Sequence, residues 1–367
     1  MWKLFRPKRL YAAIISNSPL NQKRHTGFES RMKFSIIIPT YNRADELRAT
    51  LGSLAHLDPT GDWEVIVVDN NSRDHTKAVV VEAAKAFPVA LHYLFEPEQG
   101  RCAALNAGIR AAYGQIIVTT DDDVRVEPNW LDAIAHALES LGGDYLAGKV
   151  LPIWSRQRPA WLPNRSGRHW AVIALLDYGN EPGELNKRAP LGVNMAFRHD
   201  CFERAGLWDN RLGRKAGTLL GQEVREWRLR AGAAGLTGVY SPDVVVHHVI
   251  PADRLTKRYF RRWFYWHGIS RAMLYQQARI NMESPEETTL DYSKVPHIAG
   301  VPRYLYRSCL HMLGNMLKAA VRRDQVATFE NELWLWFFAG VVKQRWKDRR
   351  KLSTFNSAIA GAAGTER

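Results

Sequence analysis

Cysteine is scarce in this chain of 367 residues, and that scarcity excludes two kinds of architecture. The three cysteines, Cys102, Cys201 and Cys309, lie far apart and form no CxxC pair. Their spacing argues against a disulfide framework and against a zinc site, and it fits a reducing cytoplasm. Long hydrophobic runs are missing too. No stretch reaches about 20 apolar residues, so the sequence predicts no simple transmembrane helix.

Acidic residues are in the minority, with 37 Asp and Glu against 51 Lys and Arg, which gives a net charge of +14. A basic surface can bind nucleic acid, anionic lipid or phosphorylated substrates. The chain lacks helix-turn-helix, RNA-recognition and zinc-finger patterns, so we expect no nucleic-acid partner. It also lacks the glycine-rich motifs GxGxxG and GxxxxGK[ST], so a bound phosphate group must be held in another way.

Strand and helix patterns alternate in the first part of the chain. Apolar runs typical of buried strands occupy residues 34–39, 64–69, 91–95 and 115–120. Helices are predicted between them over residues 45–57, 74–87 and 101–112. This alternation predicts an α/β fold with a parallel sheet and helices on both faces. Residues 150–190 are rich in Pro, Trp, Arg and Gly and indicate long loops.

The most informative feature that is present is the run of three carboxylates Asp121-Asp122-Asp123. It follows the apolar run at 115–120, so it lies at the C-terminal end of a buried strand. That edge is where open α/β sheets bind ligands. Three crowded acids repel one another unless a cation joins them, and carboxylate oxygens suit Mg²⁺ or Mn²⁺. The alternative interpretation is a solvated acidic turn.

Polar residues also follow the other predicted strands, at positions 39–43, 69–72 and 98–101. In a doubly wound sheet these loops lie side by side and form a cleft of nucleotide size. An aspartate in such a cleft can accept hydrogen bonds from a base or a ribose hydroxyl. Because no glycine-rich nest is present, a pyrophosphate there needs a cation, which the triple aspartate would anchor.

These segments resemble the inverting family-2 glycosyltransferases of the GT-A fold. The resemblance rests on SIIIPTYN at 35–42, VVDNNS at 67–72 and DDD at 121–123, in order and at normal spacing. GVNMAFR at 192–198 resembles the acceptor-side segment of that family. The resemblance implies a nucleotide-diphospho-sugar transferase fold, Rossmann-like with a mostly parallel sheet, followed by a helical C-terminal extension.

The activity implied is metal-dependent transfer of a single sugar, using Mn²⁺ or Mg²⁺. The donor would be a nucleoside-diphosphate sugar, with a UDP-sugar favoured, and the acceptor a hydroxyl of a glycan or lipid-linked molecule. Such reactions belong to the biosynthesis of cell-surface polysaccharide or glycolipid. Processive synthases of the family carry Gln-x-x-Arg-Trp and transmembrane helices, and Lys343-Gln344-Arg345-Trp346 lacks that spacing.

The resemblance also assigns donor-binding residues. Asp69 would read the base, Asp121 would lie near the ribose or sugar, and Asp123 would ligate the metal, while Asp122 fills the variable middle position. The implied nucleotide and donor-binding set is Pro39, Thr40, Tyr41, Asn42, Asp69, Asn71, Gln99, Gly100, Arg101, Asp121 and Asp122.

Inverting transfer needs a base that removes the proton of the acceptor hydroxyl. The family places an acid in a Gly-Glu-Asp-like segment close to a helix start, and the match here is Gly221-Gln222-Glu223. Gln222 replaces the usual first acid and Glu223 the usual aspartate, so Glu223 is the expected base and Glu226 the fallback. The alternative is a charged helix N-terminus, where the macrodipole favours glutamate.

Two histidines, His247 and His248, end the last predicted strand. The resemblance implies that one of them completes the metal site, and strand alternation sends only one into the cleft; we prefer His247. The alternative is a structural histidine. On the acceptor side we expect Asn194, Met195 and Trp161, although a tryptophan at 161 is equally suited to anchoring a long loop.

The C-terminal third is helical, basic and aromatic. Ten apolar residues at 333–342 precede a basic cluster at 343–351, a pattern that suits a helix lying in the interface of an anionic membrane. Residues 304–321 are also apolar with basic ends. The alternative is a helical subdomain packed on the sheet or on a second subunit. We therefore expect a cytoplasmic protein, peripheral at the inner face of the cell membrane.

The expected domain organisation has four parts. They are a basic tail (1–32), a GT-A catalytic domain (33–253, with a nucleotide-binding half at 33–124 and an acceptor half at 125–253), a helical extension (254–353) and a tail (354–367).

The departure at Gln222 leaves open a second function, that of a catalytically impaired GT-A scaffold in a polysaccharide assembly complex.

Overall fold

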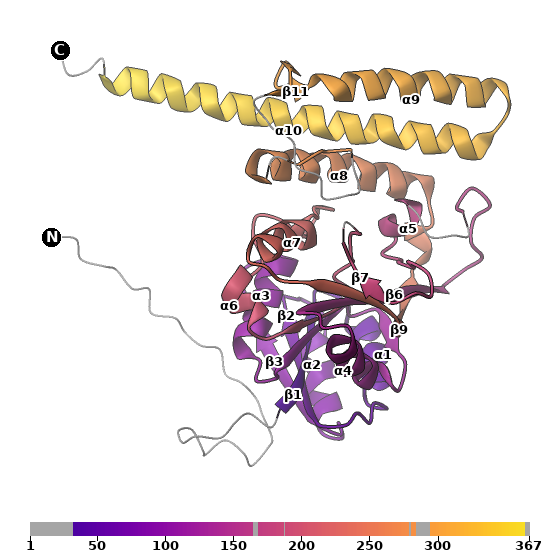
Figure 1. Cartoon of the computed structure of the whole chain (residues 1–367), viewed down its shortest axis with the longest axis vertical. Helices are drawn as coiled ribbons and strands as arrows, with labels where there is room; N and C mark the ends of the chain where they lie inside the picture. The colour runs from indigo at the N-terminus through magenta and orange to yellow at the C-terminus, as the bar shows by residue number, and fades with distance from the viewer. Residues whose placement is uncertain (1–31, 164–167, 187, 279, 284–293, 364–367) are drawn as a thin grey trace.

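The computed structural model describes residues 32–163, 168–186, 188–278, 280–283 and 294–363 (Figure 1). The predicted basic tail lies outside these residues except for Met32, which begins the first strand. Strands of the central sheet are β1 (Met32–Thr40), β2 (Asp62–Asp69), β3 (Ala90–Phe95), β4 (Ile116–Thr120), β5 (Val124–Val126), β6 (Tyr145–Trp154), β7 (Gly183–Glu184), β8 (Asn194–Arg198) and β9 (Gly238–Ile250).

The sheet confirms the expected α/β class. Its order is β3-β2-β1-β4-β8-β6-β9-β5, with β7 paired to β9. Strands β3, β2, β1 and β4 run parallel, so their C-terminal ends meet at one edge. Strand β8 runs antiparallel to β4 and β6, and β5 runs antiparallel to β9, so the second half of the sheet is mixed.

Helices lie on both faces of the sheet, as predicted (Figure 1). Those of the sheet domain are α1 (Ala44–Leu54), α2 (Thr76–Ala84), α3 (Arg101–Ala111), α4 (Trp130–Ser140), α5 (Arg168–Val172), α6 (Cys201–Ala205) and α7 (Glu223–Ala233). The region predicted as loops, 150–190, contains the end of β6 together with the short elements α5 and β7.

Alternation along β1 builds two apolar cores. Phe34, Ile36 and Ile38 are fully buried with α1, α2 and α4, whereas Ile37 is buried with α3 on the other face. Gly108 lets α3 approach β1, since a Cβ there would lie 2.5 Å from Ile37 Cγ2. Apolar packing on both faces of the sheet holds the strands in place. The points at which the loops leave the strand ends are thereby set.

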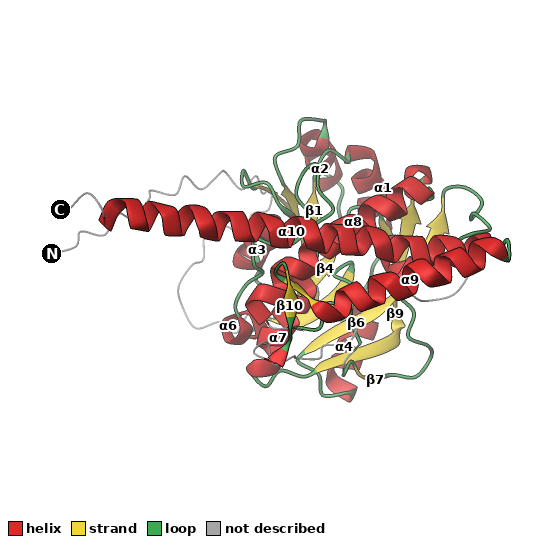
Figure 2. Cartoon of the chain, turned by 90° about the horizontal axis from the view of Figure 1, so that it is seen from above, coloured by secondary structure: helices red, strands yellow, loops and turns green. Residues whose placement is uncertain are grey.

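The C-terminal extension contains η1 (Ala252–Arg254), α8 (Lys257–Ala278), a small hairpin of β10 (His297–Ile298) and β11 (Val301–Pro302), α9 (Arg303–Val321) and α10 (Gln325–Ala363). Helix α8 lies between the sheet domain and the α9–α10 pair (Figure 1). Seen from above, α10 crosses the whole domain with α9 beside one of its halves (Figure 2). Helix α10 continues to Ala363, so residues 354–363 are helical rather than the expected tail.

Helices α8 and α10 touch through their backbones at two glycines. A Cβ at Gly268 would clash with the carbonyl of Phe337, and one at Gly340 with the carbonyl of Tyr265. Phe337 is itself buried in this contact. Much of the apolar run at 333–342 therefore packs on α8, as the subdomain alternative expects. No helix of the described residues is long and apolar enough to cross a bilayer.

Candidate active site

A cavity of about 760 Å³ opens at the edge where β1, β2 and β4 end. Its walls come from the loops after these strands and after β3, from residues 189–193, 214–216 and 218–225, and from α8 and α10. We call the part at the strand ends the polar half of the cavity. It is lined by Pro39, Thr40, Tyr41, Arg43, Asn70, Gln99, Arg101 and Asp121-Asp122-Asp123.

The three aspartates point to different partners. Asp121 lies 2.8 Å from the guanidinium of Arg101. Asp122 is turned inward, where it accepts hydrogen bonds from Thr40 Oγ1 at 2.8 Å and from Arg43 at 2.7 Å. Burial raises the pKa of the Asp122 carboxyl to about 7, against the opposing charge of Arg43. Asp122 therefore fastens the acidic turn to the segment after β1. Asp121 is the more exposed of the two acids.

Asp123 is almost fully buried beside one histidine and two arginines. Its Oδ2 lies 2.8 Å from Arg43, 3.2 Å from His248 and 3.7 Å from Arg254. Although burial opposes ionisation, these neighbours hold the pKa of the Asp123 carboxyl well below its usual range. Yet neither carboxylate oxygen accepts a hydrogen bond of good geometry from a described residue. The Asp123 side chain is therefore a buried carboxylate whose oxygens still lack well-aligned hydrogen-bond donors among these residues.

The residues around Asp123 fit a divalent cation in part. Two oxygens of Asp123 and a nitrogen of His248 are suitable ligands, and the buried Nδ1 of His248 has no hydrogen-bond partner among the described residues. No group of three or more His, Cys, Asp or Glu in the described part of the chain is arranged to hold a metal ion. A cation here would need further ligands, and phosphate oxygens of a substrate are of the right chemistry.

The histidine preferred from the sequence, His247, faces away from Asp123. It lies 2.7 Å from Glu127 instead. The histidine beside Asp123 is therefore His248 and not the expected His247. The reason is the register of β5 with β9, which pairs Val124 with His248 and so brings His248 beside Asp123. Alternation then turns His247 to the other face.

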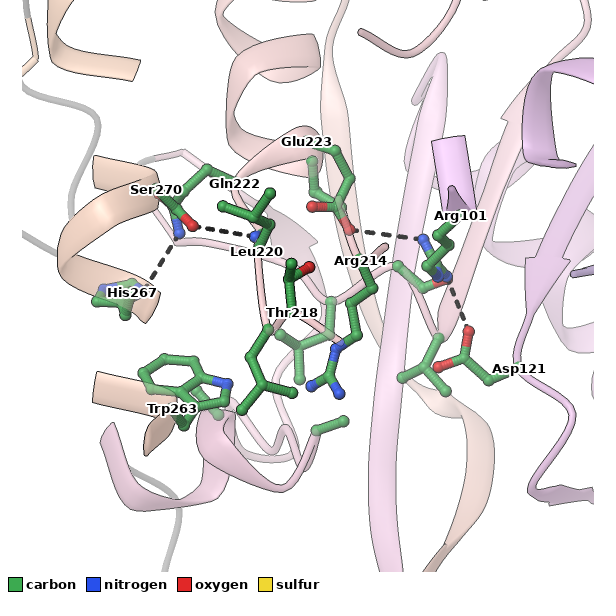
Figure 3. A pocket seen from close by; sticks show the side chains of 18 of the residues that line it. Arg101, Asp121, Arg214, Thr218, Leu220, Gln222, Glu223, Trp263, His267 and Ser270 are labelled. Carbon is green, nitrogen blue, oxygen red and sulfur yellow. Dashed lines mark hydrogen bonds and ion pairs between the residues drawn. The ribbon is translucent and has the colours of Figure 1, made fainter. Parts of the chain in front are cut away.

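The expected base, Glu223, lines the same cavity at the start of α7. One guanidinium, that of Arg101, lies 3.6 Å from Glu223 and 2.8 Å from Asp121 (Figure 3). The preceding residue, Gln222, adopts the left-handed conformation with φ of 79°, which turns the chain into the helix. Arg101 thus connects Asp121 to Glu223, the expected base.

The fallback base, Glu226, lies elsewhere. Both of its carboxylate oxygens pair with Arg230, at 2.7 and 2.8 Å, one turn along α7. It does not line the cavity. This geometry is an intrahelical ion pair, and it leaves Glu223 as the acidic residue of α7 that lines the cavity.

Five of the expected donor-side residues besides the aspartates face the cavity: Pro39, Thr40, Tyr41, Gln99 and Arg101. Others shape its loops. Asn42 and Asn71 adopt left-handed conformations, with φ of 52° and 68°, and Asn71 is exposed. Gly100 donates its N–H to Asn70 Oδ1 at 2.7 Å. Asn42, Asn71 and Gly100 therefore shape the loops at the polar half of the cavity but do not line the cavity.

Asp69 is also turned into the protein. Its carboxylate accepts hydrogen bonds from the N–H of Ser72 at 2.8 Å and from the hydroxyl of Tyr93 at 2.7 Å. Burial and this carboxylate raise the pKa of Tyr93 above its usual range. The neighbouring Asn70 lines the cavity instead, and its amide holds the carbonyls of residues 96 and 98. Base reading by Asp69 stays a prediction.

The acceptor-side residues expected at Asn194, Met195 and Trp161 are corrected. Asn194 is buried, and its amide donates to two carbonyls and accepts from Trp130, so it fastens β8 to its neighbours. Met195 is buried in the core beside α3. Trp161 packs edge-on against Phe260 of α8 at 4.9 Å, which is the loop-anchoring alternative.

Helix α8 contributes side chains that the motifs did not reveal. Ser270 Oγ accepts the N–H of Gly221 at 3.1 Å, and His267 lies 3.5 Å from the amide of Gln222 (Figure 3). Trp263 and Arg214 also line the cavity. The helical extension is therefore part of the site, because it holds the turn that precedes Glu223. The basic and aromatic sequence of α8 did not predict this contact.

The fold and the site together define a class. A sheet of this order, with an acidic turn after β4 facing a polar cavity, is the arrangement of nucleotide-diphospho-sugar transferases of the GT-A fold. The mannosyltransferase PcManGT of Pyrobaculum calidifontis, solved with GDP-Man and Mn²⁺, matches over 86% of this chain and 88% of its own, with a TM-score of 0.59 and 20% identity. That likeness shows the fold.

Sequence comparisons give the family. Residues 35–204 match the family described as glycosyl transferase family 2. Glycosyltransferase AglE of Haloferax volcanii is 27% identical over 62% of this chain and 70% of its own. A glucosyl-dolichyl phosphate glucuronosyltransferase of the same organism is 25% identical over 67% and 80%. Residues 35–204 are therefore similar to glycosyltransferase family 2, and the chain is a glycosyltransferase, as its motifs implied.

Proposed function

We propose that this enzyme moves one sugar from a nucleoside-diphosphate sugar to a hydroxyl of a glycan or lipid-linked acceptor, with inversion. The observation that supports it is that Arg101 joins Asp121 to Glu223 within one cavity. A donor held at the aspartates and an acceptor at Glu223 would be neighbours. A UDP-sugar is the first donor to test, and the GDP-Man of the Pyrobaculum enzyme makes a GDP-sugar the second.

The donor diphosphate belongs beside Asp123. Arg43 and Arg254 lie against that carboxylate and are suited to contact phosphate oxygens. Mn²⁺ or Mg²⁺ fits Asp123 and His248, and when bound it would offset negative charge on the departing diphosphate. Asp121, paired with Arg101, lies between this point and Glu223 and would face the sugar.

Glu223 acts as the base in the proposed reaction. Its carboxylate accepts the proton of the acceptor hydroxyl, and the oxygen forms a bond to the anomeric carbon. The bond from that carbon to the diphosphate breaks, and its electron pair leaves with the diphosphate. Arg101 orients Glu223 and keeps it close to the donor side. Attack opposite the leaving group inverts the anomeric configuration.

A pair of isosteric variants tests this assignment. Glu223→Gln keeps the size of the side chain but cannot accept the proton, so we expect transfer to fall by about 10²–10⁴-fold while nucleotide binding persists. Glu226→Gln is the matched control, one helical turn away and outside the cavity, and we expect near-normal transfer. If both variants transfer like the wild type, Glu223 is not the base. A wild type that neither transfers nor hydrolyses donors would support the scaffold alternative.

The setting of the reaction is proposed from the same resemblance. The name of the glucuronosyltransferase relative includes a lipid-linked acceptor, glucosyl-dolichyl phosphate. We place the present enzyme in cell-surface polysaccharide or glycolipid biosynthesis, peripheral at the inner face of the cell membrane. An anionic membrane surface is then a partner as well as the two substrates.

We place the membrane contact on α9 rather than at 333–342. Four apolar side chains spaced three or four residues apart form one exposed face of α9. They are Leu310, Leu313, Leu317 and Val321, exposed by 69, 38, 57 and 85%. Helix α9 contains no Asp or Glu, and Arg303, Arg307 and Lys318 carry positive charge along it. An apolar face flanked by cations suits an anionic lipid surface.

A further inference from the structure

Beyond Glu223 the character of the cavity changes. The wall there is built mostly from apolar side chains, which we call the apolar half of the cavity. It includes Leu175, Leu191, Leu219, Leu220, Trp263 and Trp334. Leucine offers no hydrogen bond to sugar hydroxyls, so this wall is poorly suited to a purely hydrophilic glycan and well suited to an apolar chain.

The aromatic part of this wall is fixed by packing between α8 and α10. Trp263 stacks on His267, with ring centroids 4.6 Å apart and planes 15° from parallel. Trp334 of α10 packs edge-on against Phe264, at 6.3 Å. Both tryptophans are only partly buried and line the cavity. A preformed wall of this kind binds an apolar group without having to reorganise first.

Arg214 lies at the border between the two halves. In Figure 3 its side chain points into the cavity between Asp121 and Trp263. Its guanidinium neighbours the hydroxyl of Tyr259, and the carboxylates of Asp121 and Glu223 act on it without forming an ion pair with it among the described residues. The N–H of Arg101 donates to the Arg214 carbonyl at 2.8 Å, so the segment that carries Arg214 is fastened to the donor side.

The other arginines at the polar half are already engaged. Arg43 and Arg254 lie against Asp123, and Arg101 lies between Asp121 and Glu223. Arg214 therefore offers a guanidinium for a second anion, one that is separate from the donor diphosphate. A guanidinium binds phosphate through paired hydrogen bonds.

We propose that the apolar half of the cavity is the acceptor site, and that it takes a molecule in which a phosphate group links a hydroxyl-bearing sugar to a long apolar chain. The phosphate would lie on Arg214, the chain along Trp263 and Trp334, and the reacting hydroxyl at Glu223. This inference rests on the proposed function and deepens it, because it selects the lipid-phosphate class from the glycan and lipid-linked acceptors named above.

Calorimetric titration of the full-length protein tests this with three probes: farnesyl phosphate, farnesol and inorganic phosphate. We expect farnesyl phosphate to bind at least about tenfold more tightly than either other probe, since only it satisfies both the cation and the apolar wall. Arg214→Gln should weaken farnesyl phosphate by about tenfold and leave farnesol unchanged. Trp263→Ala should weaken both prenyl probes.

Controls separate this site from other sources of binding. Trp336→Ala removes an exposed tryptophan of α10 that does not line the cavity, and it should change nothing. Leu317→Asp on α9 should not affect farnesyl phosphate, because a loss there would indicate surface adsorption. Binding of a nucleoside diphosphate with Mn²⁺ should be normal in the Arg214 and Trp263 variants, which shows that they fold.

Three results would overturn the proposal. They are equal affinity of farnesyl phosphate and farnesol, unchanged farnesyl phosphate affinity in Arg214→Gln, and no prenyl binding by a wild type that binds nucleotide. The last of these would leave sugar transfer intact and reject only the acceptor class. Failure of the proposed function would instead appear as normal transfer by Glu223→Gln.

Discussion

The polar half of the cavity and its apolar half come from different parts of the chain, and different structural features position their side chains. Loops after β1, β2, β3 and β4 build the polar half, so the order of the parallel strands brings their side chains together. The apolar half depends on residues 171–225 and on two helices that begin more than a hundred residues after the acidic turn. The comparison teaches that the polar half is determined by the order of the strands, whereas the apolar half depends on how the helical extension packs on the sheet domain.

Gly268→Ala is the change that we expect to disturb the apolar half of the cavity most strongly while it leaves the polar half intact. The added Cβ would meet the carbonyl of Phe337, and backbone cannot move aside as a flexible side chain can. We expect the free energy of unfolding to fall by about 3 kcal/mol, the upper part of the range for overpacking. Transfer should be lost while nucleotide binding is largely retained at low temperature.

Gly314→Ala is the matched control for that experiment. A Cβ at Gly314 of α9 meets no atom within 4 Å, so the substitution should stabilise the helix by up to about 1 kcal/mol. Denaturant titration and nucleotide calorimetry on both variants give the comparison. If Gly268→Ala transfers and unfolds like the wild type, α8 does not hold the apolar half in place.

The double variant Leu310→Asp, Leu317→Asp should affect neither half of the cavity. Both leucines are exposed, so folding and nucleotide binding should be normal. Sedimentation with vesicles that contain phosphatidylglycerol should fall several-fold, because charge on the apolar face opposes insertion. Val81→Asp, on an exposed position of α2, is the matched control and should sediment like the wild type.

Two observations would contradict the membrane contact. One is unchanged sedimentation of the double variant. The other is a wild-type dimer in light scattering that becomes a monomer in the double variant, which would assign the α9 face to a second copy of the chain. Equal binding to pure phosphatidylcholine would also remove the role of the basic residues.

Asp122→Asn is expected to have a small effect on transfer, because this carboxyl faces inward. Its pKa of about 7 lies above the ordinary aspartate value of about 3.9, so between these values the folded state keeps a proton that the unfolded state has released. Wild-type stability should therefore fall, through this group, as pH rises toward about 7. The slope is at most about 1.4 kcal/mol per pH unit.

Asparagine cannot titrate, so that slope should disappear in the variant. Urea denaturation at several pH values between about 5 and 8 measures it. Asp45→Asn serves as the control, since Asp45 is 84% exposed in its ion pair with His75 and should keep the wild-type slope. An identical pH dependence in Asp122→Asn and the wild type would show that Asp122 is ionised in the folded protein.

The sequence predicted the sheet and the position of the acidic turn for a physical reason, whereas the candidate base Glu223 came from the family resemblance and stays a prediction. Buried strands read as apolar runs, and the loops after parallel strands must meet at one edge. It did not predict which histidine meets Asp123, because that depends on the register of β5 with β9. Nor did it predict that Arg43 would reach across to Asp122 and Asp123, which only the packed positions of two loops decide.

The acceptor side was harder for a similar reason. Asn194 and Met195 lie in a family-like segment, but strand alternation and pairing bury both of them. Trp263 lies in an aromatic, basic helix whose pattern resembles a surface helix as well as a packed one. Only the docking of α8 against the turn at Gly221 shows that it completes the site.

The central claim is that the polar half of the cavity holds the diphosphate of a sugar donor at Asp123. Calorimetric titration of UDP and GDP, each with Mn²⁺, into the wild type and Asp123→Asn tests it most directly. We predict metal-dependent binding of at least one nucleotide by the wild type and a loss of about 10–100-fold in the variant. Equal nucleotide affinity in the two proteins, with or without Mn²⁺, would contradict the claim.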